Sequence, residues 1–238
     1  MHIVTYLTNN DRAAFAQAWP DDGAKMAAMM RAQRPHWRYS TVRCIDGEFP
    51  DTLEGIDGVI ITGSPASCRD DRLPWMQPLM AAIRQLDQAR VPTVGICFGH
   101  QAIARALGGD VGTAANWGLG RGHCRWREPM PWMQPWQADM TLMAAHQEQV
   151  LHPPAQAQVL GGSAHCPIGS MLIGQHLWTT QFHPEMSPAF MEQLLTFLSD
   201  HLDPEVIERA RAQASAPNDA DLFAQWMAQF FEWERTPT

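Results

Sequence analysis

The segment VPTVGICFGHQAIARALGG at residues 91–109 constrains the fold more than any other part of the chain. An apolar run with strand-forming residues stops next to Cys97, and helix-forming residues follow it at once. Two glycines that flank a cysteine indicate a turn too tight for ordinary side chains. A strand, a G-x-C-x-G turn and a helix have the geometry of a nucleophile elbow, which exposes a reactive side chain at the carboxyl edge of a sheet.

Strand-like and helix-like segments alternate through the first half of the chain. Short β-branched or apolar runs predict strands at 2–7, 38–44, 58–63 and 91–96. Helical spacing of apolar residues occurs between them, at 24–33 and 74–90. This alternation predicts a doubly wound, mostly parallel α/β sheet of the flavodoxin-like type, with helices on both faces. Its reactive edge is expected at Cys97.

The second half has a different pattern. Shorter candidate strands separated by turns fill residues 120–180, and they predict a small antiparallel addition to the parallel sheet. Ser187-Pro188 opens a helix that runs to residue 202, where we place the end of the main domain, 1–202. Residues 203–238 are expected to form a helical extension. Its aromatic face (Trp226, Phe230, Trp233) either packs on the domain or forms an interface, such as a homodimer contact or a partner-docking surface.

Charge and composition exclude several classes of partner. The formal charge is −8 without a long run of Lys or Arg, which argues against nucleic acid or an anionic membrane as partner. We find neither a bilayer-spanning stretch nor a signal peptide, and therefore expect a cytoplasmic location. The five cysteines are odd in number and widely spaced, as expected for reduced thiols. The pairs His123-Cys124 and His165-Cys166 lack a zinc-ligand spacing, so we expect no metal site.

A thiolate nucleophile needs a base, and the segment LWTTQFHPEMSP supplies a candidate. His183 and Glu185 lie two residues apart at the end of a predicted strand, where strand alternation would put both on one face. A carboxylate beside an imidazole selects its tautomer and supports the imidazolium. Taken alone, the G-x-C-x-G turn is equally consistent with a packed cysteine before a helix, and the second motif is better explained as an exposed histidine with an incidental glutamate. Together they predict a Cys-His-Glu catalytic triad.

GICFGHQ at 95–101 followed by HPE at 183–185 resembles the class I, triad-type glutamine amidotransferase domains. The similarity extends from about residue 38 to residue 200. Three further segments in the same order resemble the family: ITGSPASCRDD at 61–71, GGDVG at 108–112 and AAHQEQVLHPPAQAQVLGGS at 144–163. One departure is Gly63-Ser64-Pro65, where many members have Gly-Gly-Pro.

The resemblance implies roles for particular residues. Cys97 would be the nucleophile, His183 the acid and base, and Glu185 its orienter. The oxyanion hole would consist of the backbone N–H groups of Gly63 and Phe98. Gln101 and Gln147 would help to hold the substrate glutamine. The reaction would pass through a γ-glutamyl thioester and would need neither metal nor organic cofactor.

Three functions are compatible with these residues. The first is hydrolysis of the glutamine side-chain amide, with the ammonia passed to a separate acceptor synthetase, since the signature of a fused ATP-pyrophosphatase is absent from the sequence. The second is hydrolysis of γ-glutamyl peptides or amines by the same triad. The third is a regulatory or binding protein on this scaffold, which loss of a triad residue would have favoured. A peptidase with its histidine directly after the nucleophile fits less well, because His100 stands three positions after Cys97.

The segment at 117–136 is rich in glycine and tryptophan but matches no phosphate-binding motif. Residues 117–122 are expected to form a loop at the border of the pocket. The tryptophans Trp126, Trp132 and Trp136 are expected to pack over the sheet, the alternative being a lid that recognises the substrate.

Overall fold

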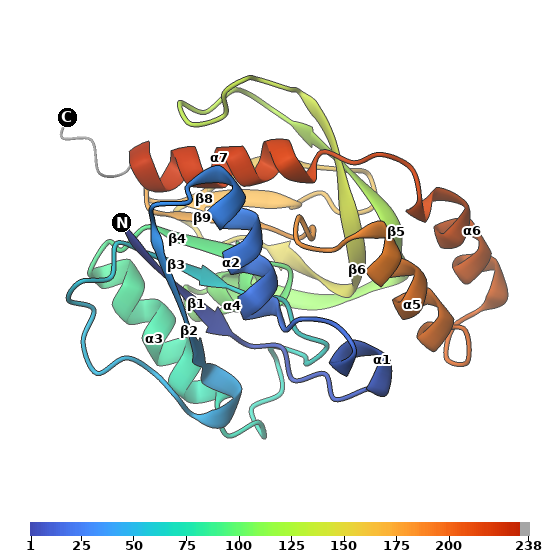
Figure 1. Cartoon of the computed structure of the whole chain (residues 1–238), viewed down its shortest axis with the longest axis horizontal. Helices are drawn as coiled ribbons and strands as arrows, with labels where there is room; N and C mark the ends of the chain where they lie inside the picture. Colours follow the sequence, from blue (N-terminus) through green and yellow to red (C-terminus); the bar gives the residue numbers. More distant parts are fainter. Residues whose placement is uncertain (234–238) are drawn as a thin grey trace.

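In the computed structural model, which describes residues 1–233, nine strands form one sheet in the order β2-β1-β3-β4-β9-β8-β7-β5-β6 (Figure 1). The first five in this order are parallel to one another: β2 (Arg38–Arg43), β1 (His2–Leu7), β3 (Gly58–Ile61), β4 (Thr93–Ile96) and β9 (Leu177–Thr180). The other four pair antiparallel: β8 (Ser170–Ile173), β7 (Ala157–Gly162), β5 (Asp110–Trp126) and β6 (Asp139–His152). The predicted α/β class is confirmed.

Helices cover both faces of the parallel strands because successive strand residues point to opposite faces. In β3, Ile60 belongs to one buried core, whereas Val59 and Ile61 belong to the other. The first core is covered by α2 (Asp22–Gln33) and α7 (Ala220–Trp233). The second is covered by α3 (Met76–Gln88) and α4 (Phe98–Ala106). The carboxyl ends of the parallel strands are left open for a site.

The antiparallel part is built from longer strands than expected. β5 and β6 have 17 and 14 residues and form a long hairpin, and the loop predicted at 117–122 is wrong because these residues belong to β5. Glycines and a register shift between Thr113 and Gly118 interrupt β5 and hide its strand pattern. At Gly120, φ is +87° and a Cβ would lie 2.9 Å from the backbone of Ala210, so glycine lets α6 (Pro204–Ala214) approach. The segment 177–183 was also expected in the antiparallel part; its strand β9 pairs antiparallel with β8 but parallel with β4, so it joins the two parts.

The C-terminal helices cover the sheet. Ser187 caps α5 (Pro188–Leu198), its side chain accepting a hydrogen bond from the N–H of Phe190. In α7, Trp226 and Phe230 are fully buried and contact Trp126 and Trp132. This aromatic face is therefore filled from within the chain, and a homodimer contact would need another surface. Residues 234–238 of the predicted extension lie outside the described residues.

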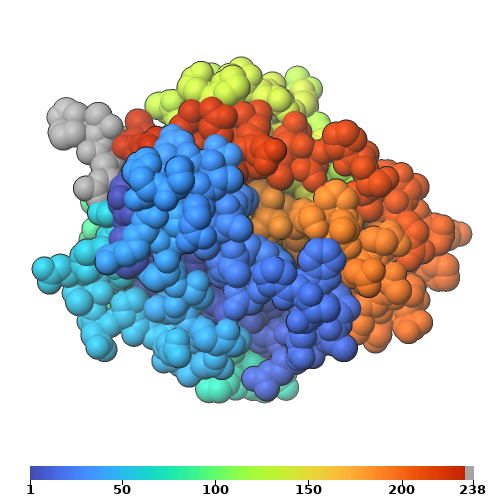
Figure 2. All heavy atoms as spheres, viewed as in Figure 1, coloured from blue at the N-terminus to red at the C-terminus, as the bar shows by residue number. Residues whose placement is uncertain are grey.

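In Figure 1, α7 runs across the upper part of the molecule and α5 and α6 lie together at its right-hand end, and Figure 2 shows the same segments at the surface of this face. α7 lies across the sheet beside α2, and Arg34 joins the two helices through paired hydrogen bonds of 2.6 and 2.7 Å to Glu232. Trp136 is 37% exposed and stacks on the indole of Trp226. The tryptophans of 126–136 thus serve mainly as packing. Within residues 1–233, the helices are too short or too polar to cross a membrane.

Candidate active site

Cys97 forms the turn between β4 and α4 with an unusual backbone conformation. Its φ is +49° and its ψ is −100°, a region that costs a residue with a side chain about 1–3 kcal/mol. The turn is held from both sides: the N–H of Cys97 donates to the carbonyl of Thr180 at 2.8 Å, and that of Gly99 to the carbonyl of Thr62 at 3.2 Å. A Cβ at Gly99 would overlap the carbonyl of Ile61. The elbow predicted from G-x-C-x-G is thus present in the structure.

The elbow aims the start of α4 at the thiol. Phe98 is the first residue of α4, and a first residue has a backbone N–H without an acceptor inside its own helix. The helix dipole adds partial positive charge at the same end. A helix start of this kind stabilises an oxyanion that forms close to it.

His183 and Glu185 form a close pair beside the thiol. The Nδ1 of His183 lies 2.6 Å from Oε1 of Glu185, and the two side chains are 5% and 1% exposed. These residues follow the end of β9, so the strand alternation expected from the sequence does not place them. Instead the N–H of His183 donates to the carbonyl of Met143 in β6 at 2.8 Å. The antiparallel hairpin therefore helps to position the histidine.

The pair carries charge in a dry environment. Burial by itself lowers the pKa of His183, but the negative charges of Glu185 and Cys97 outweigh it and raise this pKa well above its ordinary value. The other ring nitrogen, Nε2, is buried and has no hydrogen-bond partner among the described residues. It is therefore available to exchange a proton with a reacting group at Cys97.

The β3–α3 loop approaches the imidazole at Gly63. A Cβ there would lie 2.8 Å from Cε1 of His183, so the loop and the ring come this close only because residue 63 is glycine. The hydroxyls of Thr8 and Thr62 donate to the carbonyl of Gly63 at 3.3 and 3.2 Å. The carbonyl of Gly63 shares its peptide with the N–H of Ser64, so in a trans peptide these bonds turn that N–H to the opposite side. Ser64 replaces the second glycine of the family pattern, and its hydroxyl donates to Asn10 at 3.1 Å.

A chain of amides connects the predicted substrate residues to the nucleophile. Nε2 of Gln101 donates to the carbonyl of Glu148 at 2.7 Å and to Oε1 of Gln181 at 3.2 Å. Gln181 in turn directs its own Nε2 at the sulfur of Cys97, 3.4 Å away. Sequence reasoning missed Gln181, although its position two residues before His183 was a usable signal. Gln147 lines the same pocket and is half-buried.

Glu148 is a second residue that sequence reasoning passed over, although the motif HQEQV contains it. Its carboxylate accepts hydrogen bonds from Ser67 at 2.8 Å and from Arg69 at 2.7 Å. These partners belong to the β3–α3 loop, so Glu148 joins that loop to β6. Its side chain is 20% exposed and lines the pocket.

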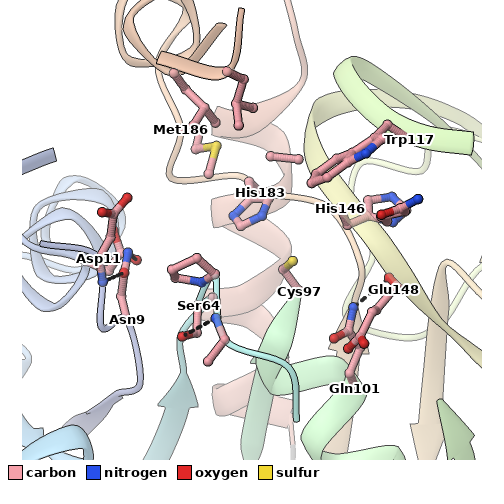
Figure 3. A pocket seen from close by; sticks show the side chains of 18 of the residues that line it. Asn9, Asp11, Ser64, Cys97, Gln101, Trp117, His146, Glu148, His183 and Met186 are labelled. Atoms are coloured by element: carbon pink, nitrogen blue, oxygen red, sulfur yellow. Dashed lines mark hydrogen bonds between the residues drawn. The ribbon is translucent and has the colours of Figure 1, made fainter. Parts of the chain in front are cut away.

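These groups surround a pocket of about 350 Å³ at the carboxyl ends of four adjacent strands (Figure 3). Asn9 follows β1, Gly63 follows β3, Cys97 follows β4 and His183 follows β9. Trp117 of β5 and His146 of β6 close one side. The structure therefore brings all seven predicted site residues to one place: Gly63, Cys97, Phe98, Gln101, Gln147, His183 and Glu185.

Other titratable groups nearby are in apolar surroundings. Burial raises the pKa of Cys68 and Cys166 to about 12, as for unreactive core thiols. Burial also lowers the pKa of His100 and His146 to about 3, so both rings are neutral. The ring of His100 contacts Thr179 at 2.7 Å, away from the residues that line the pocket. Neither fits a general base that accepts a proton near neutral pH.

Comparison with known proteins identifies the same region. The family model described as "Glutamine amidotransferase class-I" matches residues 26–199. Gamma-glutamyl peptidase 3 of Arabidopsis thaliana is 32% identical over 174 residues, which are 66% of this chain and 67% of that protein. A GMP synthase [glutamine-hydrolyzing] of Porphyromonas gingivalis is 28% identical over 141 residues, 58% of this chain and 27% of that protein.

The fold agrees with that of a solved structure. The crystal structure of a glutamine amidotransferase from Thermotoga maritima superposes with a TM-score of 0.74 at 18% sequence identity. The match covers 97% of this chain and 98% of that one, so the fold extends over the C-terminal helices as well.

Proposed function

The chain belongs to the class I glutamine amidotransferase family, and from this premise we propose that it hydrolyses the γ-amide bond of glutamine or of a larger γ-glutamyl amide through a thioester on Cys97. The observation that carries the proposal is the buried imidazole of His183, whose Nδ1 lies 2.6 Å from the carboxylate of Glu185. The charges of Glu185 and Cys97 raise the pKa of this imidazole. An enzyme of this family with these groups is a cysteine hydrolase, and we propose γ-glutamyl amides as its substrates.

The reaction would proceed in two halves. The Cys97 thiolate attacks the γ-carbonyl carbon, and the C–S bond forms while the carbonyl oxygen becomes an oxyanion near the N–H groups of Phe98 and Gly63. The C–N bond then breaks, and the imidazolium of His183 gives its proton to the departing nitrogen. A water molecule, deprotonated by His183, attacks the thioester. The C–S bond breaks, which releases glutamate and restores the thiolate.

The glutamyl group needs a place for its α-ammonium and α-carboxylate. Glu148 supplies a carboxylate on the side of the pocket where Gln101 and Gln147 lie, and we assign it to the α-ammonium. No lysine or arginine is among the described residues that line the pocket. The α-carboxylate would therefore be held by amide N–H groups, and Gln147 is the candidate, because the N–H groups of Gln101 already donate to Glu148 and Gln181.

The test is a measurement of glutamate release by the purified chain from glutamine and from γ-glutamyl ethylamide. We expect release that is absent in Cys97→Ala and unchanged in Cys44→Ala, a matched control that removes a buried thiol outside the pocket lining. With hydroxylamine present, the thioester should be diverted to γ-glutamyl hydroxamate. Release that persists in Cys97→Ala, or its absence with every γ-glutamyl compound, would refute the proposal.

A second candidate is the supply of ammonia to a separate acceptor synthetase. It is supported by the match to the glutamine-hydrolysing GMP synthase, of which this chain covers 27%. In that case glutamine would be the preferred substrate, and hydrolysis would accelerate when the acceptor enzyme is bound. A preference for larger γ-glutamyl amides would argue against this candidate.

A further inference from the structure

The pocket extends from Cys97 in two opposite directions. Figure 3 shows Cys97 between Asn9 and Asp11 on one side and Trp117, His146 and Glu148 on the other. The second side carries the residues assigned above to the glutamyl group. The first side, here called the leaving-group side, contains Asn9, Asp11 and Asp22, and the α5 residues Phe190 and Phe197 join it through contacts with the N-terminal segment.

The leaving-group side has no use in the hydrolysis of glutamine. Ammonia has a single heavy atom and needs no subsite, yet Phe190, Leu194 and Phe197 present one face of α5 to this space. Phe197 is 42% exposed although it is aromatic and lies at the pocket. An apolar wall beside a nucleophile is typical of a site that buries an apolar ligand group.

This wall is held in place by aromatic contacts with the N-terminal segment. The ring of Phe15, in α1 (Ala14–Gln17), lies 4.9 Å from that of Phe197 and 6.0 Å from that of Phe190. Lys25 lies over the ring of Phe190 at 4.0 Å, and Trp19 meets this ring edge-on. The apolar surface therefore exists before any ligand binds, which reduces the entropy cost of binding.

The leaving-group side has two carboxylates, Asp11 and Asp22, and Lys25 neutralises the second. Asp22 is paired with Lys25 at 2.9 Å and accepts a hydrogen bond from Asn9. Asp11 accepts a hydrogen bond from the N–H of Ala13 and lines the pocket. Because Lys25 is already engaged by Asp22 and the described lining residues include no lysine or arginine, a carboxylate on the leaving group would face Asp11 without a cation to pair with.

We propose that the leaving-group side binds an apolar amine, so that the substrate is a γ-glutamyl amide whose nitrogen carries an apolar group and no carboxylate. The proposal rests on the proposed function, since it specifies the substrate of the same thioester reaction. Hydrolysis would release glutamate and the free amine, with His183 giving the proton to the amine nitrogen.

The first test compares kcat/KM for glutamine, γ-glutamyl phenethylamide and γ-glutamyl phenylalanine. The last two differ only by the carboxylate of the leaving group. We expect the phenethylamide to exceed each of the others by about tenfold or more, the range expected for burying an apolar group of this size. A value for the phenethylamide no higher than that of glutamine would overturn the apolar subsite. Faster hydrolysis of γ-glutamyl phenylalanine would overturn the exclusion of the carboxylate.

The second test changes the wall. Phe197→Ser should lower the ratio of kcat/KM for the phenethylamide to that for glutamine by about fivefold or more. The matched control is Leu151→Ser, since Leu151 is 46% exposed and lies outside the pocket lining, and this ratio should not move. Asp11→Asn should reduce the ratio of kcat/KM for the phenethylamide to kcat/KM for γ-glutamyl phenylalanine, because it removes the negative charge that disfavours the carboxylate. An unchanged ratio in Phe197→Ser would contradict the assignment of the wall.

The two proposals fail in different ways. Hydrolysis that depends on Cys97 but favours glutamine leaves the proposed function standing and removes only the apolar subsite. Failure of all three compounds to yield glutamate removes the proposed function and the subsite together.

Discussion

The carboxylate of Glu185 lies 2.6 Å from Nδ1 of His183, with only 1% of the Glu185 side chain exposed. In Glu185→Gln the charge that supports the imidazolium is lost while the size is kept. We expect the pKa of His183 to fall, because burial, which lowers it, would then act against the Cys97 charge alone. The thiolate–imidazolium pair requires a protonated His183, so the alkaline limb of the pH profile of kcat/KM should move to lower pH. The value of kcat should fall by about 10²–10⁴-fold.

The control for this prediction is Glu192→Gln, which changes an exposed carboxylate of α5 that is paired with Arg211. Its pH profile should match that of the unmodified enzyme. An alkaline limb that stays in place in Glu185→Gln would show that Glu185 does not support the charge on His183.

Gly63→Ala should separate activity from stability. The new Cβ would lie 2.8 Å from Cε1 of His183, so the ring must shift. A displacement of this kind typically costs about 10²-fold in kcat. Circular dichroism and the urea midpoint should change little, because the loop lies at the pocket. The neighbouring change Ser64→Ala adds no atom and should keep most of the activity; equal activity of Gly63→Ala and the unmodified enzyme would refute the prediction.

Gln181→Leu removes the amide that donates to the sulfur of Cys97 at 3.4 Å. We expect kcat to fall about tenfold or more and alkylation of Cys97 by iodoacetamide to slow at neutral pH, since a hydrogen bond to the thiolate favours that form. Gln158→Leu, a change at an exposed glutamine bonded to Glu128, serves as the control. Equal alkylation rates in the two variants would mean that Gln181 only supports Gln101.

Glu148→Gln tests the assignment of the α-ammonium. Loss of the negative charge should raise KM for γ-glutamyl substrates about tenfold or more and affect kcat less, because the α-ammonium is bound equally in the ground state and the transition state. The matched control is Asp71→Asn. Asp71 lies on the β3–α3 loop outside the pocket lining, and the change breaks its ion pair with Arg105 of α4. A fall in kcat at constant KM would instead indicate that Glu148 positions the loop.

Protonation of buried His100 should destabilise the fold in acid. Its folded pKa of about 3 lies below the ordinary value, so below about pH 6.5 the unfolded chain takes up a proton that the folded chain excludes. Stability therefore falls as pH is lowered, by about 2 kcal/mol from this group between pH 7.5 and pH 5. His100→Asn lacks this loss, so its destabilisation in urea should be about 2 kcal/mol smaller at pH 5 than at pH 7.5. His36→Asn, at an exposed histidine, should show no such difference.

Local sequence was sufficient for the parallel half of the molecule and for its nucleophile. Apolar periodicity predicts β1, β4 and α4. The elbow at Cys97 is predicted by the glycines on both sides of it, where a side chain would clash with neighbouring atoms. Both features depend on residues that are neighbours in the sequence, so the sequence alone is enough to predict them. The long hairpin could not be predicted in this way, because register shifts interrupt its strand alternation and Gly120 is required by the close approach of α6.

The sequence by itself determined the fold class, the family and the identity of the predicted triad, because each depends on short motifs whose chemistry is local. Tertiary structure alone decided which groups meet. Met143 of β6 holds the backbone of His183, and Gln181 reaches the sulfur of Cys97. The N-terminal Phe15 meets Phe197 of α5 to build the apolar wall. These contacts join residues far apart in the chain, and their spacing leaves no periodic trace in the sequence.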